Sequence, residues 1–389
     1  MKNEIRAVQM GLAAQLPIHL IGIPGVGKTA TVQALARQMD RHLEVMIAAN
    51  RDRTDFGGIP VVREGRLVLE QLPWVDRLLK APRGAILFLD EIGGAPPDVR
   101  PSLLRVIAER WVGDVFLPPE KVAILAASNP GELGEGEGPE TWSLALRTRF
   151  VHIRWPAPDV DEFTRALVTG WKIPELRGVP SQEAIQAALP EAKDLVAGFL
   201  RLRPERLAPL PKPGEPSLGW PNPRTWERFA APALATWIAG GRNPEDLGAL
   251  HLLLTGALGA VGAEFLTWIR EQDLPDPEEI LADPKGFPLP KRQDHLHVYV
   301  TMVVGAVVRK PSPQRWEAAW EYLRRFPEDI LLLGGRMLVE AYREGGWANR
   351  PEWKGFVPFK DQGLVEQLLS GVSLVRAAEY GTAAASSPL

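Results

Sequence analysis

Residues 22–29 have the types and spacing of a loop that binds phosphate. They read Gly-Ile-Pro-Gly-Val-Gly-Lys-Thr, which is the pattern G-x-x-x-x-G-K-T. Glycines let the backbone turn so tightly that successive N–H groups point at one spot, and a helix that follows adds the positive end of its dipole. We therefore expect an anion to bind the loop and the start of the helix, which contain Gly22, Pro24, Gly25, Val26, Gly27, Lys28, Thr29 and Ala30.

Two side chains of this loop have separate roles. The Lys28 ammonium is expected to reach the outer phosphates of a nucleotide, and the Thr29 hydroxyl is a suitable Mg²⁺ ligand beside phosphate oxygens. The alternative is a glycine-rich turn that only caps a helix. The context disfavours it, because the motif lies between the apolar run 17–21 and the helical pattern 30–39.

Two carboxylates follow the apolar run 85–89, which has the composition of a strand buried on both faces. In a parallel sheet, ligand chemistry lies at the carboxyl ends of the strands. We expect Asp90 to hold the Mg²⁺ and Glu91 to orient or deprotonate the attacking water. The alternative, a strand capped by two solvated acids, loses weight because the same chain contains a phosphate loop.

Further polar residues lie at the boundaries of two later strands. Asn129 follows the apolar run 122–127 and is placed to reach the γ-phosphate or the water; the less favoured alternative is that it only begins a turn before Pro130. Residues 131–140 predict an acidic loop. Arg147 and Arg149 come next, directly before the strand pattern 150–154.

The elements that must position these residues alternate between strands and helices up to about residue 156. We expect strands at 17–21, 43–49, 85–91, 122–127 and 150–154, a hairpin at 58–69, and helices at 1–16, 74–80 and 102–110. Helical patterns alone then follow, at 159–169, 181–188, 191–202, 225–239, 246–271, 295–309, 314–325, 327–343 and 362–378.

Composition narrows the classes of function. The chain has 389 residues, of which 45% are hydrophobic, enough for packed cores in two or three domains. Its formal net charge of −3 disfavours nucleic acid as a partner, and the lack of cysteine excludes disulfides and thiolate metal sites and suits a cytoplasmic location. The apolar segment 247–263 is shorter than the roughly 20 residues of a membrane span, so we expect a buried helix and no membrane span.

These motifs resemble those of the AAA+ ATPases and, within them, the MoxR-like family. Residues 22–29 are similar to the Walker A loop, residues 86–91 to Walker B with its catalytic glutamate, and Asn129 to sensor 1. Residues 222–226, Asn-Pro-Arg-Thr-Trp, resemble the sensor 2 motif, which implies that Arg224 contacts the γ-phosphate from a helical lid. The resemblance implies ATP and Mg²⁺ as cofactors.

The resemblance also assigns residues that act between subunits. Arg149 matches the arginine finger that enters the neighbouring site, where such a residue is worth about 10³ to 10⁵ in rate, with Arg147 as the alternative. Residues 58–69 and 109–113 are similar to two hairpins that face the pore of a ring in relatives, though both can also be ordinary hairpins. Asn50 is either the residue that restrains Glu91 in some relatives or a plain strand-end asparagine.

The fold class we expect is α/β: an AAA+ P-loop NTPase domain, with a parallel sheet flanked by helices, followed by an all-helical lid and a helical C-terminal extension. The expected domains are the nucleotide-binding domain at 1–156, the lid with sensor 2 at 157–285, a C-terminal helical region at 286–380 and a flexible tail at 381–389.

The function implied is an ATPase that forms a homo-oligomeric ring, expected to be a hexamer, and remodels or activates a protein client in a chaperone-like way. Clients of relatives often contain a von Willebrand factor A domain. The alternatives are a motor or clamp loader acting on nucleic acid, which would need basic pore loops, and a nucleotide-dependent scaffold without turnover. The scaffold is disfavoured because Lys28, Asp90, Glu91 and Arg224 are all present.

Overall fold

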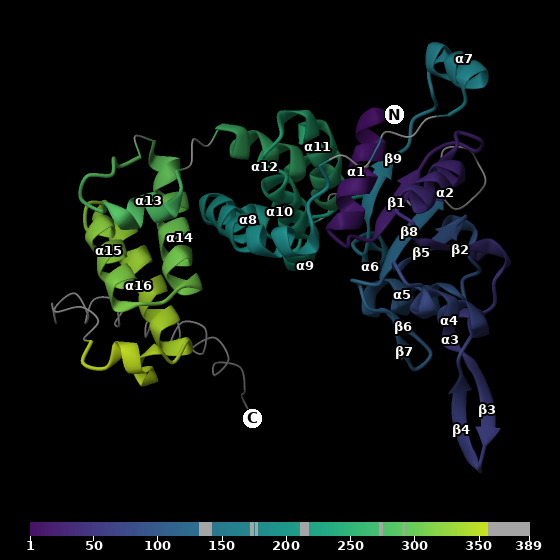
Figure 1. Cartoon of the computed structure of the whole chain (residues 1–389), viewed down its shortest axis with the longest axis horizontal. Helices are drawn as coiled ribbons and strands as arrows, with labels where there is room; N and C mark the ends of the chain where they lie inside the picture. Colours follow the sequence, from purple (N-terminus) through teal and green to yellow (C-terminus); the bar gives the residue numbers. More distant parts are fainter. Residues whose placement is uncertain are drawn as a thin grey trace, which may run out of the picture. The chain divides into compact units, whose positions relative to one another are not determined.

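A computed structural model describes residues 1–131, 142–171, 175, 178–210, 218–271, 275–290 and 292–356. Nearly all of the predicted acidic loop, the predicted helix at 362–378 and the tail at 381–389 lie outside these residues. The chain divides into two compact units, residues 1–196 with 203–269, and residues 197–202 with 270 onward (Figure 1). Each unit is described by itself below.

The first unit contains a five-stranded parallel sheet with the strand order β2-β5-β8-β1-β9. In chain order the strands are β1 (Ile18–Ile21), β2 (His42–Ile47), β5 (Ala85–Asp90), β8 (Val122–Ser128) and β9 (Val151–Arg154). Ile18 of β1 is in register with Leu125 of β8 on one side and Val151 of β9 on the other. All five carboxyl ends therefore meet at one edge of the sheet, as the predicted α/β fold requires.

Helices cover the sheet, and the side chains between helices and sheet form the hydrophobic core. They are α1 (Lys2–Ala13), α2 (Lys28–Gln38), α4 (Pro73–Lys80), α5 (Arg100–Glu109) and the short α6 (Leu144–Arg147). Leu87 and Leu89 of β5 share one hydrophobic cluster with Val75 of α4 and Val106 of α5, and all four side chains are buried. This packing holds the carboxyl end of β5, where two predicted site residues follow.

Two hairpins interrupt this pattern. After α3 (Arg53–Gly57), strands β3 (Ile59–Arg63) and β4 (Arg66–Glu70) form an antiparallel pair that extends away from the sheet (Figure 1), which confirms the predicted hairpin. Strands β6 (Trp111–Val112) and β7 (Val115–Phe116) form a shorter pair. The turn of this second hairpin lies against the end of α3, directly before β3, because a Cβ on Gly113 would lie 3.1 Å from the Gly57 carbonyl oxygen.

Except for its first helix, which projects away from the others (Figure 1), the helical part of the first unit packs on the β9 side of the sheet. It contains α7 (Val160–Thr169), α8 (Gln182–Leu202, which ends in the second unit), α9 (Pro223–Thr225), a π-helical segment (Trp226–Ala230), α10 (Ala231–Ala239), α11 (Leu247–Leu258) and most of α12 (Ala260–Glu271). Helix α11 contacts both α1 and β9. Arg6 of α1 donates two hydrogen bonds, of 2.7 and 2.8 Å, to the two carboxylate oxygens of Asp246, directly before α11.

Two predicted helix boundaries are wrong. The helices expected at 181–188 and 191–202 form one helix, α8, which continues through Pro190. Its buried residues recur at helical spacing on both sides of that proline, so packing outweighs the one lost backbone hydrogen bond. The single helix expected at 246–271 is two, because Gly259 between α11 and α12 has φ 61° and ψ −143°, a conformation open to glycine.

The second unit is a helical bundle of α13 (Pro277–Ala282), α14 (Gln293–Arg309), α15 (Pro313–Leu323) and α16 (Glu328–Glu344). Its core is rich in aromatic side chains: Trp316 of α15 makes edge contacts with Trp347 and Trp353, at ring-centroid distances of 6.3 and 6.2 Å. Within the described residues of both units, no helix is long and apolar enough to span a membrane.

A chain of buried hydrogen bonds crosses three neighbouring strands of the sheet, and we call it the histidine link. Ser128 Oγ lies 2.9 Å from His19 Nε2, and His19 Nδ1 lies 3.0 Å from His152 Nδ1. His152 Nε2 lies 2.8 Å from the Arg147 carbonyl oxygen. Trp142 stacks on the His19 ring at a centroid distance of 4.7 Å. The link therefore joins the end of β8 to the segment before β9 through the core.

Burial keeps both histidines neutral. It lowers the pKa of His19 well below its usual value, with help from the nearby His152 and Lys28, and it lowers the pKa of His152 to about 4. A carbonyl can only accept, so His152 Nε2 carries the proton and His152 Nδ1 accepts from His19. His19 Nε2 must then accept from the Ser128 hydroxyl, which gives every bond of the link one direction.

We expect this burial to make folding sensitive to acid. In the unfolded chain His152 takes up a proton as the pH falls below about 6.5, whereas in the folded chain it does so only near pH 4. Its contribution to stability is therefore complete above pH 6.5 and is lost as the pH falls toward 4, by about 3 kcal/mol. Urea unfolding at pH 7 and pH 4.5 should show a smaller loss for His152→Phe than for the wild type. The control is His251→Phe at an exposed position, and an equal loss in all three proteins would contradict the prediction.

Candidate functional site

The predicted phosphate loop connects β1 to α2 at the carboxyl edge of the sheet. Gly25 and Gly27 have φ angles of 80° and 86°, in the left-handed region that favours glycine, and a Cβ at either position would meet nothing within 4 Å. Val26 is buried, whereas Pro24 and Ala30 are exposed. Helix α2 begins at Lys28, so its free N–H groups and its dipole face the loop.

Lys28 uses its ammonium group within the loop. Its Nζ donates to the carbonyl oxygens of Gly22 and Ile23, at 2.5 and 3.1 Å, and lies 3.4 Å from Asn129 Oδ1. Burial lowers the pKa of Lys28, while the charges of Asp90 and Glu91 oppose that shift. The structure thus brings Asn129, at the end of β8, to the loop as predicted.

Thr29 and Asp90 meet across the sheet edge. Thr29 Oγ1 donates a 2.7 Å hydrogen bond to Asp90 Oδ2, while Asp90 Oδ1 accepts from the Glu91 backbone N–H at 3.0 Å. Glu91 is exposed and has φ 51°, a left-handed conformation uncommon for a residue with a side chain. A hydroxyl and a carboxylate so placed are the oxygen ligands that Mg²⁺ prefers, so the donor set fits the predicted ion.

Asn50 ends the 3₁₀ turn Ala48–Asn50, which contacts the 3₁₀ turn Ile92–Gly94 directly after Glu91. A Cβ on Gly94 would lie 3.1 Å from the Ala49 Cβ. The two turns are therefore neighbours at the same sheet edge. The role of Asn50 toward Glu91 stays a prediction.

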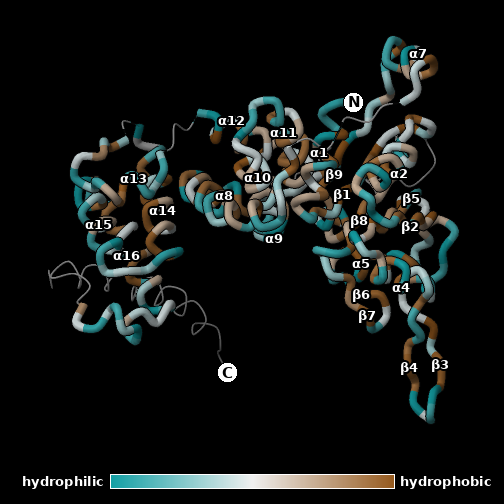
Figure 2. Tube along the Cα trace, viewed as in Figure 1, coloured by the Kyte–Doolittle hydropathy of each residue, from teal (hydrophilic) through white to brown (hydrophobic). Residues whose placement is uncertain are grey.

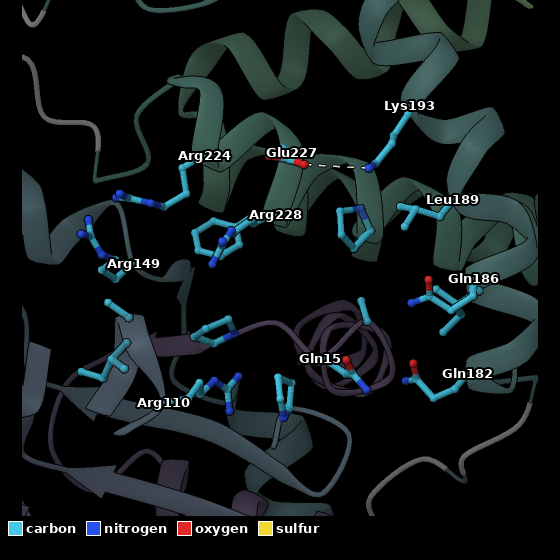
Figure 3. A pocket seen from close by; sticks show the side chains of 18 residues that line it. Gln15, Arg110, Arg149, Gln182, Gln186, Leu189, Lys193, Arg224, Glu227 and Arg228 are labelled. Atoms are coloured by element: carbon cyan, nitrogen blue, oxygen red, sulfur yellow. Dashed lines mark ion pairs between the residues drawn. The ribbon is translucent and has the colours of Figure 1, made fainter. Parts of the chain in front are cut away.

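Two of the three predicted arginines, Arg149 and Arg224, lie elsewhere, in a cavity of about 340 Å³ that we call the arginine cavity (Figure 3). Arg149 and Arg224 extend toward one another there, and burial together with the charge of Arg224 lowers the pKa of Arg149. The Arg149 Nε is buried and has no hydrogen-bond partner among the described residues. The cations of the cavity lining within the described chain are Arg110, Lys193, Arg149, Arg224 and Arg228, with Glu227 as an acid.

Local hydrogen bonds hold Arg224 in place. Asn222 caps α9 by accepting from the Thr225 backbone N–H at 3.2 Å, and Thr225 Oγ1 is 2.9 Å from the Asn222 backbone N–H. This reciprocal capping box fixes the first turn that carries Arg224. The following π-helical segment contains Arg228 and widens the helix, a feature often found at functional sites.

Arg149 is tied to the end of α6. Its Nη1 donates to the Ala145 carbonyl oxygen at 2.9 Å, and the Thr148 hydroxyl donates to the Leu144 carbonyl oxygen at the same distance. Arg147 does not line the cavity within the described residues. Its backbone carbonyl instead accepts the last bond of the histidine link. Of the two residues predicted as the finger, Arg149 is the one that lines the cavity, and its role stays a prediction.

The site residues are divided between opposite edges of the sheet. Pro17, Pro119 and Arg149 line the cavity, and these residues precede β1, β8 and β9, so the cavity lies at the amino ends of the strands. The phosphate loop lies at their carboxyl ends, and the four residues of β1 alone span about 13 Å. Arg224 therefore does not face the phosphate loop of its own chain, and its predicted contact with a γ-phosphate stays a prediction. The reason is that the helices after β9 pack on α1 and β9.

A second cavity, of about 300 Å³, lies beside the phosphate loop. It is lined by Ile21, the last residue of β1, and by Leu218, Leu252 and Gly256 among others. Its lining includes apolar side chains and glycines close to the start of the loop. A flat aromatic ring attached to a phosphate chain would suit such a surface.

The sequence analysis did not predict the other cationic residues that line the arginine cavity. Arg228 follows Arg224 by four residues, a spacing that puts two side chains on one helix face, so a signal was present. Arg110 had no comparable signal. It is buried, donates to the Val122 carbonyl oxygen at 2.7 Å, and burial lowers its pKa to about 10, so it stays charged at neutral pH. Lys193 is 3.9 Å from Glu227 (Figure 3).

Comparison with known proteins gives one family match: residues 17–150 match the AAA domain of the dynein-related subfamily. That range contains the phosphate loop, Asp90, Glu91, Asn129 and Arg149, but not Arg224. The match ends one residue before β9.

Individual relatives match a similar share of the chain. The chaperone MoxR1 of Mycobacterium tuberculosis is 30% identical over 162 residues, which are 40% of this chain and 41% of that protein. The denitrification regulatory protein NirQ of Pseudomonas aeruginosa is 28% identical over 176 residues, 43% of this chain and 64% of that protein. The chain thus covers less than two thirds of either relative. A crystal structure of a candidate ATPase from Cytophaga hutchinsonii has a TM-score of 0.44 at 18% identity, over 70% of this chain and 89% of that one.

We expect Lys28→Ala to weaken ATP binding by roughly 10- to 100-fold, because the loop loses a charge-assisted hydrogen bond to phosphate. Titration with a fluorescent ATP analogue measures this. Lys80→Ala is the matched control, since Lys80 is an exposed lysine paired with Asp76 at 2.9 Å. Equal affinities of the wild type and Lys28→Ala would refute the phosphate-loop assignment.

Proposed function

Residues 17–150 of this chain are an AAA domain of the AAA+ class, related to that of MoxR-type proteins, and from this premise we propose an ATP-hydrolysing motor that remodels a client protein. We propose that it works as a homo-oligomeric ring, with a hexamer as the expected form. The observation that carries the proposal is the division of the site: the Thr29–Asp90 pair lies at one sheet edge and Arg149 with Arg224 at the other. One chain cannot bring both groups to one phosphate.

Each half of the site has its own task in this proposal. The loop N–H groups and Lys28 bind the β- and γ-phosphates, while Glu91 orients the water that attacks the γ-phosphate in line with the leaving oxygen. Thr29 and Asp90 would hold Mg²⁺, which neutralises charge on the phosphate oxygens when it is bound. Asn129 is placed by Lys28 to contact the same phosphate.

The arginine cavity supplies the other half from a neighbouring subunit. Clustered guanidinium groups repel one another unless an anion lies among them, and a γ-phosphate is such an anion. We propose that Arg149 and Arg224 both contact the nucleotide held by the next protomer, where they stabilise charge on the transferring phosphoryl. The Arg149 Nε, which has no acceptor among the described residues, supports this, because a buried donor needs an acceptor.

We place the adenine base in the cavity beside Ile21. The base must lie within one nucleotide length of the phosphate loop, and Gly22 directly follows Ile21. The apolar side chains of Leu218 and Leu252 offer a surface for a flat ring. Both leucines come from the helical part of the unit, so base binding would connect that part to the loop.

The two hairpins are the surface we propose for the client. On β3 and β4, Val62 and Leu67 are 74% and 73% exposed, and Figure 2 shows hydrophobic residues along both strands. Arg63 pairs with Glu70 across the strands at 2.6 Å, which offsets its charge. Exposed apolar side chains with offset charges favour a protein over nucleic acid. A client with a von Willebrand factor A domain is the specific hypothesis.

We expect Glu91→Gln to bind ATP with near-normal affinity and to lose turnover by at least about 100-fold, because the amide cannot accept the proton of the attacking water. Phosphate release measures turnover, and the analogue titration measures binding. Glu64→Gln, at an exposed turn of the β3–β4 hairpin, is the control. Normal turnover in Glu91→Gln would remove the catalytic role of that carboxylate.

Mixing variants tests whether sites are shared. Arg149→Ala and Arg224→Ala should each bind ATP but hydrolyse it slowly, by about 10³-fold for the finger. A mixture of Arg149→Ala with Glu91→Gln should regain activity, since some interfaces then join an intact Glu91 to an intact Arg149. Arg224→Ala mixed with Glu91→Gln should recover in the same way. No recovery in either mixture would show that the arginines act within their own chain.

A further inference from the structure

We propose that His19 and His152 are positioning residues that connect the nucleotide-sensing end of β8 to the arginine finger of the same chain. The proposal rests on the proposed function, in which Arg149 serves the neighbouring subunit. It assigns to the histidine link the task of holding Arg149 in the orientation that suits the state of the chain's own nucleotide site.

The Ser128 end of the link touches the nucleotide site directly. The Ser128 carbonyl oxygen accepts from the backbone N–H of Gly22, the first loop glycine, at 3.3 Å, while its hydroxyl donates to His19. The next residue, Asn129, contacts Lys28 through its side chain. A phosphate that draws Lys28 or Asn129 toward itself therefore acts on the residue that begins the link.

The other end of the link is the last residue of α6. The Arg147 carbonyl oxygen accepts from His152, and Arg149 lies two residues further along the chain. Arg149 and Thr148 are bonded back to α6 carbonyls, so the turn from Leu144 to Arg149 moves as one piece. Shifting the Arg147 carbonyl would thus shift the Arg149 guanidinium.

The hydrogen bonds of the link are better explained by a role in transmitting movement from β8 to Arg149 than by stabilisation of the fold alone. Each donor has one acceptor, and both rings are buried: His19 stacks on Trp142, and Phe150 lies tilted against it at a centroid distance of 5.6 Å. In a buried site, a hydrogen bond is strong and an unpaired polar group is costly. When one partner of such a bond moves, the other is therefore expected to move with it. An apolar pair would fill the same space at lower cost, which leaves the ordered polar contact to be explained.

The test replaces His152 by Phe, which fits an aromatic surrounding but cannot donate to Arg147. We expect kcat, measured at saturating ATP, to fall roughly 10- to 100-fold, as for a catalytic group displaced by about 1 Å. Because His152 also lines the cavity where we place the base, ATP affinity is measured separately for each variant. His152→Gln keeps a donor near the Nε2 position and should restore most of kcat. Thr236→Val is the matched control, since it removes one buried bond to the Pro232 carbonyl oxygen, of 2.9 Å, in α10. Equal loss of kcat in that control would overturn the proposal.

Mixed rings then locate the defect. His152→Phe mixed with Glu91→Gln should regain activity, because Glu91→Gln subunits supply an intact finger, whereas His152→Phe mixed with Arg149→Ala should not. The reverse pattern would place the defect in the chain's own site and overturn the proposal. Failure of Arg149→Ala with Glu91→Gln to recover would instead refute the shared site, so the two failures are distinct.

Ser128→Ala decides the question if His152→Phe does not fold. It removes the hydroxyl that begins the link and leaves both rings in place. We expect the same pattern in mixed rings with a smaller loss of kcat, of roughly 3- to 10-fold for one buried hydrogen bond. Unchanged kcat in Ser128→Ala at unchanged ATP affinity would overturn the proposal.

Discussion

The parallel register of β1 between β8 and β9 is the constraint on which the rest of the first unit depends. Because the three strands run in one direction, every residue that follows a strand reaches one edge and every residue that precedes a strand reaches the other. The phosphate loop and Asn129 belong to the first group, and Arg149 to the second. No side-chain rearrangement within one chain can exchange these positions, so the separation of the two half-sites follows from the sheet itself.

The chemistry of the carboxyl edge was predictable because it is local. The glycines, Lys28 and Thr29 are consecutive, and Asp90 ends a strand whose apolar composition already showed that it is buried. Arg224 was different. Its motif resembles sensor 2, but the motif does not indicate which surface of the sheet the later helices cover. The packing of those helices depends on contacts such as Arg6 to Asp246, 240 residues apart. The histidine link could not be predicted from the sequence for the same reason, since His19 and His152 become neighbours only through strand pairing.

The arginine cavity holds several positive charges close together, an arrangement that is unfavourable for the charges themselves. Burial and the neighbouring Arg224 lower the pKa of Arg149, which means that the free chain holds this guanidinium in a position less favourable for its charge than water would be. A capping box and the backbone carbonyls of α6 keep the groups there. An anion bound among these groups would reduce the repulsion, and in the proposed ring that anion is the γ-phosphate held by the next protomer.

The β3–β4 hairpin has one further property. Among the described residues these strands pair only with each other, so each has an outer edge of backbone N–H and C=O groups beside exposed apolar side chains. An extended polypeptide can add to such an edge through its main chain, whose groups are the same in every sequence except at proline. Binding of this kind depends on whether a segment is extended and not on its amino-acid composition. In the proposed motor, such an edge would select clients by whether they present an unpaired extended segment, whatever its sequence.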